Sequence, residues 1–440
     1  ATATVAAYAF FSLYTERDVA WPIAAAICVL VVGPLMGLAY ELLARSLVEA
    51  TLVHKVAATV GVMVLVQATI SIVYPVKAQR AVLQFLPSNS WEIAGTPVRA
   101  YQVIVVGIAL AATVGLAVFF RVSRTGVAMR AVVDNADLLD LAGTNPVSVR
   151  RWAWMIGSSF AAASGVLLSP LLAKLNAIDL TFLVITAFGA AAIGAFTSIP
   201  LTYLGGLAIG IGQALTAKWF TEGFLVGLSP SLPFIVLFLV LLVSPKSRLV
   251  EFSLPPRQVV QLRQPPSAVQ LAVGAGLVVF LYFVPNIFAF EIIGWTTALT
   301  YFMVFSSLGL LVRTSGQVSL AHVSFMVIGA CAFSHLTIDQ GMGWWTALLL
   351  SGLIAVPIGA ILAIPAIRMS GLYLALATFG FGILLQYMFY GQDFMFGSLG
   401  VPLSAPRPDM VRFQDDAGFF RLVLGIAVLT AVVLTVVTRS

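Results

Sequence analysis

The side chains that could handle a solute in this sequence are a few polar ones inside long apolar runs. Thr59 and Gln67 lie eight residues apart, which is about 80 degrees around a helix, so they share a broad face. Thr378 and Gln386 repeat that spacing. Such hydroxyl and amide groups either line a path for a polar solute or hold helices together by hydrogen bonds. Both interpretations stay open.

A second candidate is the polar break from Ser315 to His322, between two apolar runs. Irregular backbone at membrane depth is tolerated where it is buried in protein or lines a cavity. We therefore expect the break to form part of a translocation path. Its candidate residues are Gly316, Gln317, Ser319 and His322.

Motifs for catalysis, ATP hydrolysis or metal binding are missing. None of the lysines follows a glycine, which excludes a P-loop, and no H-E-x-x-H, CxxC or G-x-S-x-G occurs. The three histidines have no companion at metal-ligand spacing, and Cys28 and Cys331 each lie inside an apolar run. The chain is predicted to be no enzyme and to bind no cofactor or metal itself.

The composition indicates an integral membrane protein. Hydrophobic residues make up 60% of the chain and charged residues 9%, whereas roughly a quarter of a soluble domain is charged. Apolar runs of about 20 residues separated by short polar loops predict an all-α polytopic membrane protein with about 13 to 14 spans or partial spans. The net charge of +6 comes from basic residues at the ends of these runs, so no nucleic-acid partner is expected.

The polar stretch from residue 121 to 151 predicts a short helix, Ala136 to Ala142. Asn135 can cap it, Asp137 suits its first turn, Gly143 suits the left-handed position after it, and Pro146 prevents continuation. Either this helix is where a partner binds, or the stretch is a solvated connecting loop. The basic residues around it are Arg121, Arg124, Arg130, Arg150 and Arg151.

A linker rich in proline and basic residues, 244–267, divides the chain into a first half, 1–243, and a second half, 268–440. Assigning alternate loops to the two sides of the membrane puts 14 of the 23 Lys and Arg residues on one side and nine on the other. The side with more positive charge is cytoplasmic. That places both the linker and residues 121–151 on the cytoplasmic side.

An internal repeat relates the halves. The pattern A-T-x-G-x-x-x-L-x-Q begins at Ala58 and again at Ala377, an offset of 319 residues. Both copies run outward in this topology, which predicts two homologous halves in a parallel repeat about a pseudo-two-fold axis along the membrane normal. The shared glycines, Gly61 and Gly380, would suit close helix packing. The offset also predicts that copy one lacks its start and copy two its end, with a second docking helix expected beyond Ser440. Either the chain is a portion of a longer one, or the halves have diverged in content.

These residues resemble the permease subunits of branched-chain amino acid importers of the ATP-binding cassette class. The first half, with Gly126 to Ala131, Ala142 to Asn145 and Ala161 to Val166, looks like one permease type. The second, with Gly316 to His322, Arg368 to Thr378 and Gly397 to Gly400, looks like its companion type, so the chain resembles a fusion of both.

The resemblance implies partners and a substrate. It implies a bacterial cytoplasmic (inner) membrane protein that receives branched-chain or other hydrophobic amino acids from an extracytoplasmic binding protein. Two cytoplasmic ATPase subunits would bind the ATP. The same class could instead carry urea, short amides or aromatic acids, and a secondary carrier or channel that works alone is the other alternative. This sequence has Asp-Leu-Leu at 137–139 where the family tends to have Glu-Ala-Ala. The residues implied for ATPase docking are Asn135, Asp137, Leu138, Leu139, Gly143 and Asn145.

Overall fold

Helices make up nearly all of the computed structural model of this chain. The structure describes residues 1–48, 50, 52–74, 81–93, 96–172, 174–244, 266–367, 369, 371–392, 394–395 and 405–439. Within them, 11 helices are long and apolar enough to cross a membrane, and the apolar helix His322–Ile338 is shorter. This confirms the polytopic helical architecture. Most of the predicted linker, together with Arg368, Ser370 and residues 397–400, lies outside the described residues.

The chain forms two compact units, 1–211 and 212–440. The elements of the first are α1 (Thr2–Phe11), η1 (Ser12–Glu16), α2 (Trp21–Ile27), η2 (Cys28–Val32), α3 (Gly33–Ser46), α4 (Leu52–Val73), β1 (Ser90–Ile93), β2 (Thr96–Arg99), α5 (Ala100–Val122), α6 (Arg124–Asp134), α7 (Ala136–Leu141), α8 (Pro146–Leu168), η3 (Ser169–Leu171), α9 (Ala177–Ile193) and most of α10 (Ile199–Trp219).

The second unit begins within α10. Its elements are η4 (Gly223–Gly227), α11 (Leu228–Val243), α13 (Ser267–Ile287), η5 (Ala289–Glu291), α14 (Ile292–Ser315), α15 (His322–Ile338), α16 (Trp344–Ala366), α17 (Gly371–Leu385), η6 (Gln386–Tyr390), η7 (Val411–Phe413) and α18 (Asp416–Arg439). These units describe packing, and the domain limits 1–243 and 268–440 stay predictions.

The helix order repeats at the offset found in the sequence. In the first unit α1, α2, α4 and α5 begin at residues 2, 21, 52 and 100, and adding 319 gives 321, 340, 371 and 419. In the second unit α15, α16, α17 and α18 begin at 322, 344, 371 and 416. The second copy of each helix therefore starts within four residues of the expected position.

The core of the first unit is built around α1. Phe10 is fully buried and packs with Leu180 of α9 and Val166 of α8 in one apolar cluster. Two polar contacts cross this cluster: the hydroxyls of Thr4 and Thr181 lie 3.2 Å apart, and the Tyr8 hydroxyl donates to the Leu175 carbonyl at 3.1 Å. Because polar groups in lipid need internal partners, these bonds help to fix α1 between α8 and α9.

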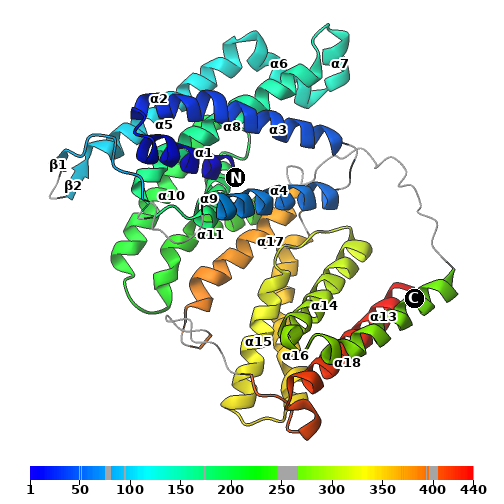
Figure 1. The fold of residues 1–440 in the computed structure, drawn as a ribbon. Coiled ribbons are helices and arrows are strands. Elements are labelled where there is room, and N and C mark those ends of the chain that lie inside the picture. The colour runs from blue at the N-terminus through cyan, green and yellow to red at the C-terminus, as the bar shows by residue number, and fades with distance from the viewer. Residues whose placement is uncertain are drawn as a thin grey trace. The chain divides into compact units, whose positions relative to one another are not determined.

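The core of the second unit joins α13, α14 and α18 around the fully buried Phe420, which packs with Val284 and Leu299. Arg421 donates to Asn286 Oδ1 at 3.0 Å and lies over the Tyr282 ring. Elsewhere in this unit α11 packs on α17 and on η6, and Phe234 of α11 stacks on Tyr387 of η6 with ring centroids 6.5 Å apart. Figure 1 shows the helices of both units.

One element departs from the all-helical expectation. β1 and β2 pair as an antiparallel ribbon, with Ser90 opposite Arg99 and Trp91 opposite Val98. Tryptophan, isoleucine and valine favour extended pairing, and the segment is too short and polar to span a membrane. The interval between the runs that end near Val73 and begin at Ala100 therefore contains this ribbon.

Candidate functional site

The predicted docking helix is present as α7. Asn135 Oδ1 accepts hydrogen bonds from the Asp137 and Leu138 amides, both at 3.0 Å, which confirms the cap. The helix ends at Leu141, one residue earlier than expected. Gly143 is left-handed, with φ of +83°, and the Thr144 amide donates to the Leu139 carbonyl at 3.2 Å. That bond closes the end of the helix in a Schellman arrangement.

The turn after α7 passes straight into α8. Asn145 Oδ1 accepts from the Val147 amide at 2.9 Å, and Pro146 occupies the first turn, where its missing N–H costs nothing. α6 packs against α5 and α8, and α7 against α6 and α8. Figure 1 shows α6 and α7 together at one edge of the first unit. The candidate docking element, defined here as residues 124–145 and called the docking element below, is thus joined directly to a long helix.

Aliphatic side chains lie open on this docking element. Val133 is 83% exposed, Leu138 62% and Leu141 85%. A Cβ at Gly143 would meet no atom within 4 Å. Arg121, Arg124 and Arg130 are exposed nearby. An exposed apolar patch with a charged rim is typical of a protein interaction surface.

The polar break forms a non-helical segment between α14 and α15. Gly316, with φ of +66°, ends α14, and Val318, Ser319 and Ala321 are buried although they belong to no helix. The Leu320 amide donates to Thr378 Oγ1 at 3.0 Å. Thr378 is 3% exposed, and its hydroxyl in turn donates within its own helix, to the Leu374 or Ala375 carbonyl. The structure therefore brings two of the predicted path elements together.

The other path candidates near this segment differ in burial and in secondary structure. His322 begins α15, and its Nδ1 is buried with no hydrogen-bond partner among the described residues. Gln317 is half-buried. Gln386 is exposed and opens the π-helical turn η6, about two turns beyond Thr378 on the same continuous helix. A buried imidazole nitrogen without a partner is a polar atom that a solute or water can satisfy.

Thr59 and Gln67 lie on α4 of the first unit, and the other path candidates lie in the second. The exposed Thr59 hydroxyl donates to the Val56 carbonyl at 2.9 Å, and Gln67 is half-buried. That these two residues face Thr378 and Gln386 across a central path stays a prediction. Among the described residues of the first unit Gly61 has no close helix neighbour, because a Cβ there would meet no atom of another element within 4 Å, whereas a Cβ on Gly380 would lie 3.5 Å from Leu237 Cδ2.

Comparison with known proteins decides the family. A family described as "Branched-chain amino acid transport system / permease component" matches residues 1–245 and 291–440. The chain belongs to this family. The two matched segments of this permease agree with the two homologous halves found in the sequence. No solved structure matches it.

Relatives named LivH, LivM and BraD match the permease. It is 31% identical over 157 residues to LivH of Salmonella typhimurium, covering 36% of this chain and 50% of LivH. It is 31% identical over 115 residues to LivM of Escherichia coli K12, covering 26% of this chain and 27% of LivM. BraD of Pseudomonas aeruginosa is 30% identical over 151 residues, covering 33% of this chain and 49% of BraD. The chain spans about half the length of the LivH and BraD relatives it matches.

Two features of the second unit were not expected from sequence. The Phe394 carbonyl lies 3.3 Å from Cys331 Sγ, which donates to it, and 2.6 Å from His335 Nε2, while His335 Nδ1 pairs with Asp339. The i, i+4 spacing of His335 and Asp339 on one helix was the available signal. Among the described residues no group of His, Cys, Asp and Glu could hold a metal ion.

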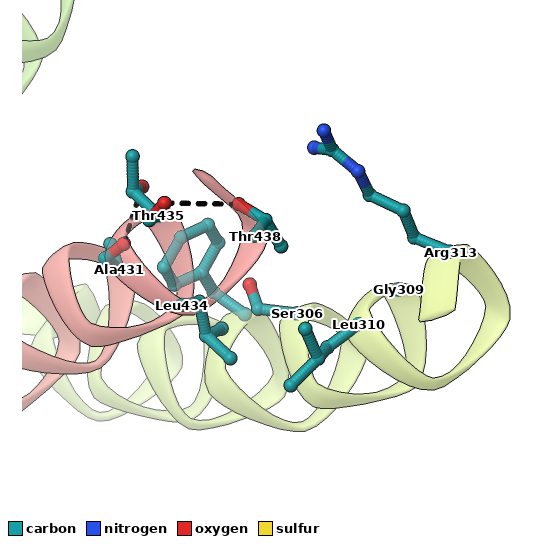
Figure 2. Close-up of a pocket in the computed structure, with 9 residues that line it drawn as sticks. Ser306, Gly309, Leu310, Arg313, Ala431, Leu434, Thr435 and Thr438 are labelled. Carbon is teal, nitrogen blue, oxygen red and sulfur yellow. Dashed lines mark hydrogen bonds between the residues drawn. The ribbon is translucent and has the colours of Figure 1, made fainter. Parts of the chain in front are cut away.

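The second unexpected feature is a groove of about 390 Å³ between α14 and α18 (Figure 2). Phe302, Leu310 and Leu434 contribute apolar walls, and Figure 2 shows Arg313 at one end with Thr438 across from it. None of the predicted path residues lines it. The groove is therefore separate from the candidate path.

Proposed function

We propose that this permease is the translocation component of an importer driven by separate cytoplasmic ATPase subunits. The observation that carries the proposal is the docking element: it is capped at both ends of α7, joined directly to a long helix, and exposed on its aliphatic side. The absence of a P-loop supports it, because such a chain needs an external source of energy. ATP would bind to the partner subunits, and this chain would bind no cofactor.

The path we propose runs past the segment 316–321. Thr378 holds this segment through Leu320, which orients Ser319 and the ring of His322 beside it. These hydroxyl and imidazole groups would exchange hydrogen bonds with the polar part of a solute while apolar neighbours accept its side chain. Gly316, Gln317, Gln386, Thr59 and Gln67 are the further candidates.

The proposed substrate class is branched-chain or other hydrophobic amino acids, delivered by an extracytoplasmic binding protein. It is supported by the relatives, whose names state branched-chain amino acid transport. Urea, short amides and aromatic acids form the alternative class. An amino acid carries both an ammonium and a carboxylate, whereas aromatic acids carry only the carboxylate and urea and short amides carry neither.

Uptake by the full-length chain, reconstituted in liposomes with its ATPase subunits and binding protein, tests this choice. We expect labelled leucine to accumulate and an excess of isoleucine or valine to suppress it, while urea and benzoate have no effect. Accumulation of labelled urea or benzoate with no uptake of leucine would assign the permease to the alternative class.

A further inference from the structure

Glu41 is a charged side chain buried within a membrane-spanning helix. It lies near the end of α3, and only 4% of its side chain is exposed. Its Oε2 atom has no hydrogen-bond partner among the described residues. Because an ionisable group in such a helix is costly to bury, its presence indicates a function, and the first question is what compensates its charge.

The compensating charge is Arg151, near the start of α8. Its Nε lies 3.8 Å from Glu41 Oε2, so the contact is an ion pair without a hydrogen bond. The Arg151 side chain is 44% exposed, in contrast to the buried carboxylate. The two members of the pair are therefore unequal: Arg151 buries only its Nε against Glu41 and exposes much of the rest of its side chain, whereas Glu41 is almost wholly buried and has its charge balanced by Arg151.

The ion pair ends a line of very close contact between α3 and α8. Gly33, Gly37 and Glu41 recur at intervals of four and share one face of α3. A Cβ on Gly37 would lie 2.5 Å from the Trp154 carbonyl oxygen, and one on Gly33 would lie 2.7 Å from Ser159 Cα. From Gly33 to Glu41 along α3, the contacted residues on α8 therefore go backward in number, from Ser159 to Arg151. The two helices are antiparallel and touch at the backbone.

Of these two helices, α8 follows the docking element directly in the chain and α3 packs against α8. Figure 1 shows α3 and α8 side by side, and α8 starts at the turn that ends α7. At its other end α3 continues from α2 through the π-helical turn η2, Cys28–Val32. Helices bend preferentially at such turns. A displacement of α7 would move the start of α8, and through the ion pair and the glycine contacts it would move α3, with the bend at η2.

We propose that Glu41 and Arg151 are positioning residues of the import cycle. Their ion pair fastens α3 to the base of α8, so that motion received at the docking element reaches a second membrane helix. The glycines bring the helices together, and the ion pair resists their sliding at the end nearest the ATPase. This inference rests on the proposed function, in which an ATPase binds the docking element.

The test is Glu41→Gln in the full-length chain, reconstituted with ATPase subunits and binding protein, with labelled leucine as the probe. Glutamine has nearly the same volume, and the half-exposed Arg151 stays hydrated, so the variant is expected to fold, to retain the ATPase and to hydrolyse ATP. Leucine imported per ATP hydrolysed is expected to fall about tenfold. Arg151→Lys, which keeps the charge, is expected to stay within about twofold of the unchanged chain. Arg45→Gln, one turn from Glu41 on the same helix, is the matched control for loss of a charge.

Three results separate the possibilities. If Glu41→Gln imports as much leucine per ATP hydrolysed as the unsubstituted permease, the inference is overturned. It is also overturned if the variant loses ATPase binding in proportion to its loss of uptake, because that result shows a merely structural defect. If the permease without any substitution binds no ATPase subunit, the proposed function itself is refuted. If Glu41→Gln fails to fold, Glu41→Asp keeps the charge but withdraws it from Arg151, and an unchanged ratio in that variant overturns the inference equally.

Discussion

Replacing Gly143 by arginine is expected to abolish binding of the ATPase while leaving the permease folded in the membrane. Gly143 has φ of +83°, which costs a residue with a side chain about 1–2 kcal/mol, and its surroundings are open, so the arginine meets no clash within the chain. The new charge would project from the surface proposed to meet the ATPase. Because an unpaired charge in an interface typically costs about 2–5 kcal/mol, affinity should fall by at least about thirtyfold.

Gly223→Arg is the matched control for this variant. Gly223 has a similar left-handed backbone, with φ of +72°, and its would-be Cβ also meets no atom within 4 Å. It lies in the turn between α10 and α11, far along the chain from the docking element. We expect Gly223→Arg to carry the same backbone cost and to co-purify with the ATPase normally. Co-purification of Gly143→Arg at the level of this control would remove Gly143 from the docking surface.

Thr378→Val is expected to loosen the segment 316–321 and to reduce uptake. Valine has the shape of threonine but cannot accept the bond from the Leu320 amide, and a buried amide left without a partner costs about 1–3 kcal/mol. Protection of the Leu320 amide from hydrogen exchange should therefore fall by about one to two powers of ten. Uptake should fall with it, because Ser319 and His322 lose their support.

Two controls accompany this change. Thr378→Ser keeps the hydroxyl and should preserve both protection and uptake. Thr314→Val removes a hydroxyl that donates to carbonyls of its own helix, and should alter neither. Full protection of Leu320 in Thr378→Val would show that the hydrogen bond does not hold the segment, and normal uptake with lost protection would exclude the segment from the path.

Local chemistry made the docking element predictable. Asn135, Gly143 and Pro146 each act on backbone within a few residues, and together they placed α7 to within one residue. The start of α8 is set by local chemistry too, although Arg150 and Arg151 lower the hydropathy of its first turns. The helix in fact begins at Pro146, where capping by Asn145 outweighs that polarity.

The contacts between distant residues could not be predicted from one sequence. Leu320 and Thr378 are 58 residues apart, and a polar break followed by a threonine does not reveal that they meet. The pairing of Glu41 with Arg151 could not be predicted either, because Glu41 lies one turn from the exposed Arg45 and that position suggests a solvated helix end. Burial at Glu41 follows from Gly33 and Gly37, which bring α8 against that face of α3. The π-turn at Gln386 also has no local signal, since its counterpart Gln67 lies in regular α-helix.

The two halves share helices at corresponding positions, but matching residues in them make different hydrogen bonds. α4 and α17 begin at corresponding positions, but the threonine of α17 holds the segment 316–321, whereas the Thr59 hydroxyl bonds within its own helix. The docking element, by contrast, is described in the first unit. Among the described residues, the proposed docking element therefore lies in the first unit and the better-defined part of the proposed path lies in the second.

The dependence of transport on ATP tests the central claim most directly. The full-length permease is reconstituted in liposomes with the binding protein and a leucine gradient, with or without the ATPase subunits and ATP on the side where they bind. The proposed function predicts accumulation against the gradient only when ATPase and ATP are both present, and no uptake by the permease alone. Rapid, saturable uptake down the gradient by the permease alone would contradict it and would identify a stand-alone carrier or channel.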